Sequence, residues 1–130
     1  MARFIVVDDD PVVRHILGAI LESIGHELVA FSEGAPALAF LRQAKQQNQP
    51  PVLAFLDFQL AEMTGIDLLT EIRKLFDHTI LPAAMLSANS RDEVLAAGSV
   101  MMPDYFLSKP FTLEDIQSLL QTAGIGAAQA

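Results

Sequence analysis

The stretch Phe4-Ile5-Val6-Val7-Asp8-Asp9-Asp10-Pro11 places a short apolar run directly before three aspartates and a proline. This run, which extends back to Arg3, predicts a strand that is buried on both faces of a sheet. Asp10 is a favourable N-cap, and Pro11 suits the first position of a helix, where its missing N–H costs nothing. The octapeptide therefore predicts a strand that ends in carboxylates and leads at once into a helix.

The rest of the chain repeats this alternation. Short apolar runs predict further strands at residues 27–31, 52–56, 80–86 and 105–107. Apolar residues at helical spacing predict helices between the strands, including a weak helix over residues 90–97. The first helix is expected to end at Gly25. The N-caps of later helices are expected at Ser32, Thr64 (with Asp67) and Thr112. Residues 43–51 are polar and predict a surface connection, and residues 124–130 predict a frayed tail. Five strands alternating with five helices predict an α/β fold, a parallel sheet with helices on both faces.

The composition narrows the class of protein. A chain of 130 residues that is 52% hydrophobic fits one domain with a real core. A net charge of −8, without any basic run, argues against direct binding to nucleic acid. The lack of cysteine excludes disulfides, thiolate zinc sites and cysteine nucleophiles. No apolar stretch approaches the ~20 residues that span a bilayer, so we expect no membrane insertion, and the aspartates so close to the start do not fit a signal peptide. We therefore expect a cytoplasmic protein.

Chemically active side chains stand where the predicted strands end. These are the pair Asp8 and Asp9, then Asp57, then Ser87, and finally Lys109 before Pro110. In a parallel sheet, ligands bind at the carboxyl ends of the strands, so these groups are expected to gather at one edge. Each alone is more often a cap, a loop residue or a solvated surface group. Their occurrence at the ends of four different strands favours a functional site.

The residue types at this edge suit phosphoryl transfer. Clustered carboxylates without His or Cys ligands favour a hard divalent cation, above all Mg²⁺. Asp57 is a candidate nucleophile, because a carboxylate can form an acyl phosphate. A bound Mg²⁺, the Lys109 ammonium and the Ser87 hydroxyl would each serve a phosphoryl oxygen.

From about residue 2 to residue 122, these motifs resemble the receiver domain of two-component response regulators. The resemblance implies the flavodoxin-like (βα)5 fold, doubly wound, with strand order 2-1-3-4-5. It implies that Asp57 is the phosphoacceptor and that Asp9, Asp57 and the backbone carbonyl of Gln59 bind Mg²⁺ or Mn²⁺, with Asp8 acting largely through water. It places one receiver domain at residues 1–123 and a short tail at 124–130.

The resemblance also assigns a switch. Ser87 and Phe106 match the family's two switch positions, and Lys109 matches its lysine, followed by Pro110 in a cis peptide. The expected phosphoryl donor is a sensor histidine kinase or a histidine phosphotransfer protein. A downstream protein target is expected on the face formed by helix 90–97, strand 105–107 and the last helix. Met63 and Gly65 lie at the family's offsets after Asp57, but Ala61 stands where most members have proline.

Two alternatives stay open. An enzyme of the aspartyl-nucleophile phosphatase class has a similar site, but it needs a second Asp two residues after the nucleophile, where this chain has Gln59. Turnover of small phosphate esters would favour this enzyme over a switch that catalyses only its own phosphorylation and dephosphorylation. A phosphorylation-independent interaction module is the other alternative. The presence of the acidic pair, Asp57 and Lys109 argues against it, whereas Ala61 and the atypical helix predicted over 90–97 keep it open. The three histidines, 15, 26 and 78, are expected at the surface.

Overall fold

The computed structural model describes residues 2–88 and 101–125. Its sheet has five strands in the order β2-β1-β3-β4-β5, and every neighbouring pair is parallel. The prediction of a flavodoxin-like doubly wound sheet is therefore confirmed. The strands span β1 Arg3–Val7, β2 Glu27–Phe31, β3 Ala54–Asp57, β4 Ala83–Ser87 and β5 Tyr105–Ser108.

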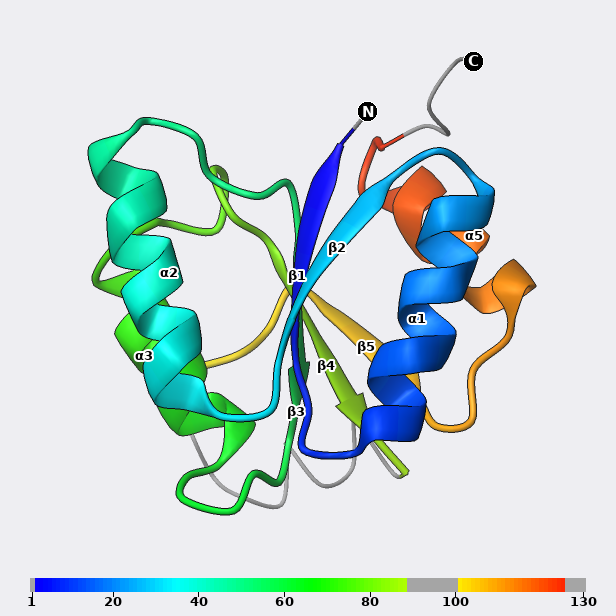
Figure 1. Ribbon diagram of the computed structural model, residues 1–130, viewed down its shortest axis with the longest axis horizontal. Coiled ribbons are helices and arrows are strands. Elements are labelled where there is room, and N and C mark those ends of the chain that lie inside the picture. The colour runs from blue at the N-terminus through cyan, green and yellow to red at the C-terminus, as the bar shows by residue number, and fades with distance from the viewer. Residues whose placement is uncertain (1, 89–100, 126–130) are drawn as a thin grey trace.

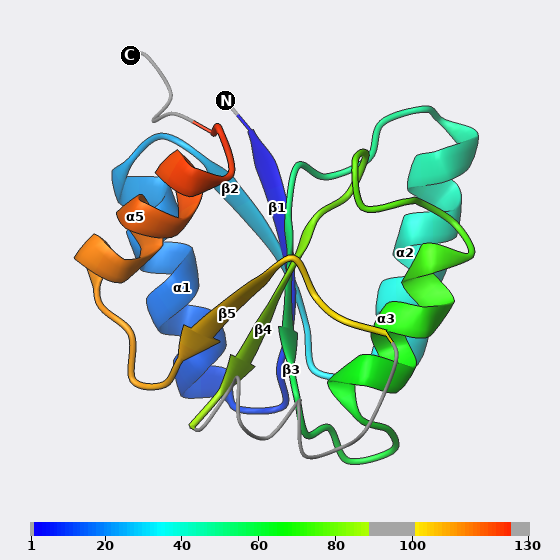
Figure 2. The same cartoon turned by 180° about the vertical axis from the view of Figure 1, so that it is seen from behind.

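Helices cover both faces of the sheet. Helices α2 (Gly34–Gln46) and α3 (Gly65–Arg73) lie on one face, and α1 (Pro11–Ser23) and α5 (Leu113–Thr122) lie on the other (Figures 1 and 2). The helix expected over residues 90–97 lies outside the described residues. No helix in the described part of the chain has the length and apolar character needed to cross a membrane.

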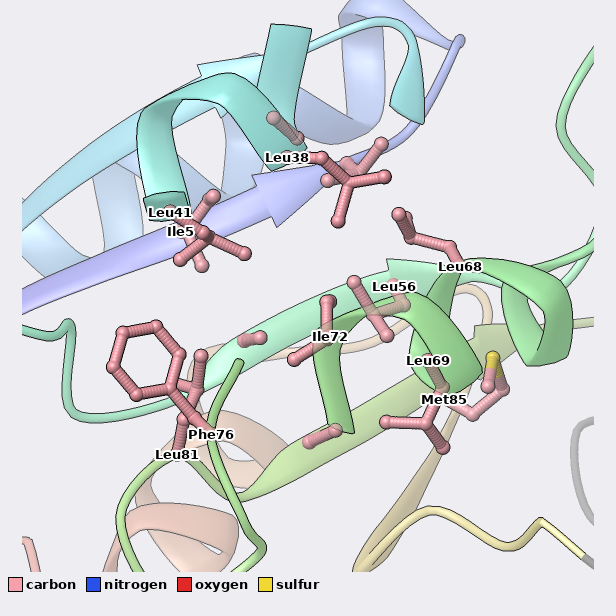
Figure 3. Close-up of a cluster of buried hydrophobic side chains, with 14 of the residues drawn as sticks. Ile5, Leu38, Leu41, Leu56, Leu68, Leu69, Ile72, Phe76, Leu81 and Met85 are labelled. Atoms are coloured by element: carbon pink, nitrogen blue, oxygen red, sulfur yellow. The ribbon is translucent and has the colours of Figure 1, made fainter. Parts of the chain in front are cut away.

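The two faces of β1 contribute to two separate cores. Successive side chains of a strand point to opposite faces, so Ile5 and Val7 pack toward α2 and α3, while Phe4 and Val6 pack toward α1 and α5. All four are fully buried, as a strand covered on both faces requires. Figure 3 shows the first core, in which side chains of β1, β3 and β4 meet those of α2 and α3, among them Leu41, Leu56, Leu69 and Ile72.

Local capping chemistry fixes the helix starts that the sequence predicts. Asp10 accepts a hydrogen bond from the N–H of Val12 at 2.9 Å. Thr64 and Thr112 each form a reciprocal capping box with the aspartate three residues later. Gly25 has a φ of 86°, the left-handed conformation that glycine adopts readily after a helix. These four predictions are confirmed.

Several predicted boundaries are wrong. The N-cap of α2 is Glu33, not Ser32, and α2 continues to Gln46, into the segment expected to be a surface connection. Strand β3 is shifted to 54–57. Strand β4 begins at Ala83 rather than at 80, because the side chain of Asp77 accepts hydrogen bonds from the N–H groups of Thr79 and Ile80 and holds them in a turn.

His26 is buried, contrary to the expectation of a surface position. Its Nδ1 accepts a hydrogen bond from the N–H of Ala2 at 3.2 Å, and its ring lies 5.2 Å from that of Phe4. His26, the residue before β2, therefore holds the start of β1 in place. His15 and His78 are exposed, as predicted.

An ion pair joins three elements at the amino ends of the strands. One guanidinium nitrogen of Arg73 donates to the carbonyl of Leu81 at 2.7 Å, and the other contacts Asp104 at 2.9 Å. Asp104 also accepts the N–H of Ala83 at 2.9 Å. The end of α3 is thus tied to the starts of β4 and β5, at the opposite edge of the sheet from Asp57.

Candidate functional site

Three carboxylates meet at the carboxyl edge of the sheet. Asp8 follows β1 and is fully buried, Asp9 is exposed beside it, and Asp57 ends the neighbouring strand β3 with 7% of its surface exposed. One oxygen from each of the three carboxylates lies within 4.8 Å of the others. The parallel pairing of β1 with β3 brings these residues together, because both strands end at the same edge.

Lys109 reaches into this group from the end of β5. Its Nζ lies 2.9 Å from Oδ2 of Asp8 and 3.2 Å from Oδ1 of Asp57. Its backbone N–H donates to the carbonyl of Ser87 at 2.9 Å, and its peptide bond to Pro110 is cis, as predicted. The ammonium group is therefore held between two carboxylates from two other strands.

The charged groups at this edge shift one another's pKa values. Burial raises the pKa of Asp57, and the neighbouring carboxylate of Asp8 raises it further, while Lys109 and the N–H of Gln59 lower it; the net effect is a raised pKa. Burial lowers the pKa of Lys109, but its contacts with Asp8 and Asp57 outweigh burial and raise the pKa overall. Lys109 is consequently positively charged at neutral pH.

The acidic group fits a divalent cation. Oδ2 of Asp8 is buried and, although the ammonium of Lys109 lies close by, it accepts no well-aligned hydrogen bond from the described residues. Three carboxylates face one ammonium group, so the edge carries excess negative charge. Oxygen ligands without nearby Cys or His suit a hard ion such as Mg²⁺ rather than Zn²⁺.

A cleft of about 480 Å³ opens over these groups. Asp9, Asp57, Gln59, Ser87 and Lys109 all contribute to its lining. Ser87 is the buried last residue of β4, and the backbone N–H of Gln59 helps to lower the pKa of Asp57. The structure thus brings together every residue that the sequence proposed for the chemistry of phosphoryl transfer.

Phe106 lies on β5, three residues before Lys109. It pairs in register with Met85 of β4 and packs against the core on the side of α2 and α3, where Met101 also packs. It also borders a groove of about 610 Å³ between β5 and α5. The β5 and α5 parts of the predicted output face are described; the predicted helix 90–97 is not.

Comparison with known proteins decides the family. A family profile described as the response regulator receiver domain matches residues 4–121. The chain belongs to the response regulator receiver family. It is a receiver domain of two-component signalling, with the fold and strand order that the resemblance implied.

Solved structures agree with this assignment. The receiver domain superimposes on the chemotaxis protein CheY4 of Vibrio cholerae with a TM-score of 0.80 and 26% identity, covering 95% of this chain and 98% of that one. The receiver domain of a sensor histidine kinase from Pseudomonas aeruginosa has a TM-score of 0.76 at 25% identity, with coverage of 95% and 98%. That second structure is described as having a magnesium ion coordinated in its active-site cleft.

Relatives of known sequence match over this domain, and several of them are about twice as long. The probable transcriptional regulatory protein TcrX of Mycobacterium tuberculosis is 30% identical over 125 residues, which are 93% of this receiver domain and 50% of TcrX. The response regulator Rcp1 of Synechocystis is 27% identical over 121 residues, 90% of this chain and 82% of Rcp1. The chain spans about half the length of TcrX and of two other relatives that it matches.

Two residues of the receiver domain support the site in ways that sequence reasoning missed. Arg14 of α1 donates to the backbone carbonyl of Asp8 at 2.6 Å and so fixes the acidic turn. Glu62, in the loop after Asp57, accepts the N–H of Gly34 at 2.8 Å. The contact of Glu62 has no local signal in the sequence, because it joins residues 28 positions apart that only the fold brings together. The contact of Arg14 spans only six residues, across the turn from β1 into α1.

Proposed function

We propose that this receiver domain accepts a phosphoryl group on Asp57. The donor is a phosphohistidine of a sensor histidine kinase or of a histidine phosphotransfer protein. One observation carries the proposal: the ammonium of Lys109 lies between Asp8 and Asp57, within a group of three carboxylates whose oxygens are mutually close. A lysine and a carboxylate nucleophile at one edge suit a reaction that depends on positioning and charge neutralisation.

The chain's own residues account for the transfer. An oxygen of the Asp57 carboxylate attacks the phosphorus, a P–O bond forms, and the P–N bond to the donor histidine breaks, leaving an acyl phosphate on Asp57. Lys109 neutralises charge on one phosphoryl oxygen, and the hydroxyl of Ser87 donates a hydrogen bond to another. Both side chains line the same cleft as Asp57.

The carboxylates also support binding of Mg²⁺ or Mn²⁺. Asp9, Asp57 and the backbone carbonyl of Gln59 would hold the ion, with Asp8 acting through water. When bound, the ion would neutralise phosphoryl oxygens that Lys109 and Ser87 do not reach. The buried oxygen of Asp8 and the excess negative charge support this assignment.

Phosphorylation then acts as a switch. It adds about −1.5 to −2 charges at the edge of the sheet. Ser87 and Lys109 move toward the new oxygens, and Phe106 fills the space behind Ser87. A downstream protein target reads the resulting change on the face that includes β5 and α5. A shift from 1:99 to 99:1 requires roughly 5.5 kcal/mol of differential interaction, within reach of several charge-assisted hydrogen bonds.

The chain acts as a switch rather than as an enzyme with an external substrate. Gln59 occupies the position where a phosphatase of similar geometry needs a titratable acid, and an amide cannot supply that proton. The receiver therefore catalyses only its own phosphorylation and the hydrolysis that reverses it.

Two neighbouring aspartates provide a matched test of the metal assignment. Phosphorylation of the chain by acetyl phosphate is measured against Mg²⁺ concentration for the natural protein, Asp9→Asn and Asp10→Asn. Asp9→Asn is expected to raise the half-saturating Mg²⁺ concentration about tenfold. Asp10→Asn is expected to change it less than about twofold, because Asp10 caps α1 and Asn caps a helix equally well. Equal shifts for both variants would contradict the assignment.

A further inference from the structure

The loop after Asp57 is a closed turn. Leu60 donates its N–H to the carbonyl of Met63 at 3.0 Å, and Gly65 donates its N–H to the carbonyl of Phe58 at 2.6 Å. These two bonds flank an antiparallel bridge between Gln59 and Thr64. Neither bond uses the carbonyl of Gln59, so the turn leaves this oxygen outside the ladder, and Gln59 lines the same cleft as Asp57.

The tip of this turn is attached to α2. The carboxylate of Glu62 accepts the N–H of Gly34, the first residue of α2, at 2.8 Å. The N-cap of the helix, Glu33, makes no side-chain capping bond of its own. A residue 28 positions away thus supplies the capping acceptor that α2 lacks locally.

Packing reinforces the attachment. Gly34 is buried, and a Cβ added to it would lie 2.8 Å from Sδ of Met63, which is closer than side chains tolerate. Residues 62 and 63 therefore contact the start of α2 by one hydrogen bond and one close van der Waals contact. Residue 61 of the turn is alanine, and alanine lacks the fixed φ of proline. The rigidity of the turn must therefore come from contacts such as these.

We infer that Glu62 is a positioning residue for divalent-cation binding: by capping α2, it holds the turn that keeps Gln59 in the same cleft as Asp57. The inference rests on the proposed function, since it concerns the same site. Groups that orient metal ligands without touching the metal commonly change affinity about tenfold or more when they are removed. Glu62 acts only through the loop, and its removal leaves Asp8, Asp9, Asp57 and Lys109 intact.

The test compares three variants of the full chain. Mg²⁺ affinity is measured by isothermal titration calorimetry, and exchange of the Gly34 amide by NMR. Glu62→Ala is expected to weaken Mg²⁺ binding about tenfold and to speed Gly34 exchange. Glu62→Gln, whose amide oxygen still accepts a hydrogen bond, is expected to keep both values within about twofold of the natural protein. Glu33→Ala, which removes an equal charge at the same helix end, is expected to behave like Glu62→Gln.

The outcomes separate the two proposals. Unchanged Mg²⁺ affinity in Glu62→Ala, or an equal loss in all three variants, would overturn the role of Glu62 while leaving phosphorylation of Asp57 untouched. Absence of Mg²⁺ binding in the natural protein would instead overturn the proposed metal site. If Glu62→Ala is poorly folded by circular dichroism, Glu62→Asp, which shortens the reach by one methylene, is expected to give an intermediate loss, and no loss would again overturn the inference.

Discussion

At the scale of single residues, Asp57 carries a charge that the fold does not favour. It is 7% exposed and lies beside the fully buried Asp8. Burial and the charge of Asp8 raise its pKa above the ordinary 3.8, and Lys109 offsets only part of this effect. In the proposed function, a cation or a phosphoryl group bound to Asp57 changes this balance of charge.

The ionised Asp57 side chain destabilises the fold, and this destabilisation depends on pH. With a folded-state pKa above 3.8, the folded protein binds a proton on Asp57 more tightly than the unfolded chain does. The destabilisation is therefore absent below the ordinary pKa, develops as pH rises through the raised one, and is complete above it. Without Mg²⁺, Asp57→Asn is expected to melt at a higher temperature than the natural protein at pH 7, and the difference is expected to shrink as pH falls toward the ordinary pKa.

Thermal unfolding followed by circular dichroism at several pH values checks this expectation. Asp10→Asn controls for the loss of one carboxylate, because Asp10 is exposed at a helix N-cap. A lower melting temperature for Asp57→Asn than for the natural protein at pH 7 would contradict the expectation, because it would show that ionised Asp57 stabilises the fold through Lys109.

At the scale of elements, two glycines show how packing discriminates between positions. A Cβ on Gly65, the first residue of α3, would collide with the carbonyl oxygen of Asp57 and lie 2.7 Å from Sδ of Met85. A Cβ on Gly18, in the middle of α1, would meet Leu28 at an ordinary 3.7 Å. The first glycine lets α3 start against the backbone of Asp57, and the second has no such packing constraint.

Substitution by alanine is expected to have opposite effects on stability at Gly65 and at Gly18. Gly65→Ala is expected to destabilise the fold by about 1–3 kcal/mol, because backbone must move, and to slow phosphorylation by displacing Asp57. Gly18→Ala is expected to stabilise it by about 0.5–1 kcal/mol, as alanine does inside helices. Urea unfolding of both variants provides the measurement. Equal stability of Gly65→Ala and the natural protein would show that α3 adjusts without cost.

The elements that sequence predicted best are those whose signals are local. Strand β1 was predicted with its observed bounds because burial on both faces leaves an unbroken apolar run, and Asp10 and Thr64 cap helices by bonds to residues two or three positions away. The start of β4 was misplaced because Ile80, although apolar, is 52% exposed in a turn that Asp77 holds. The start of α2 was misassigned because its capping acceptor, Glu62, is distant in sequence.

At the scale of the whole molecule, the two edges of the sheet have different roles. At the amino ends of the strands, Arg73 and Asp104 tie α3 to β4 and β5. At the carboxyl ends, residues of β3, β4 and the loops after β1 and β5 converge on one cleft. The topology alone predicted this convergence, because parallel strands end at a common edge. The bridging of Asp8 and Asp57 by Lys109 depends on side-chain reach and was visible only in the structure.

The central claim is that Asp57 carries the phosphoryl group, and its direct measurement is the location of that group. The chain is treated with acetyl phosphate and Mg²⁺, the acyl phosphate is reduced with borohydride to homoserine, and peptides are sequenced by mass spectrometry. We predict homoserine at position 57 in the natural protein and no modified peptide in Asp57→Asn. Modification at another carboxylate in the natural protein, or equal labelling of Asp57→Asn, would contradict the claim.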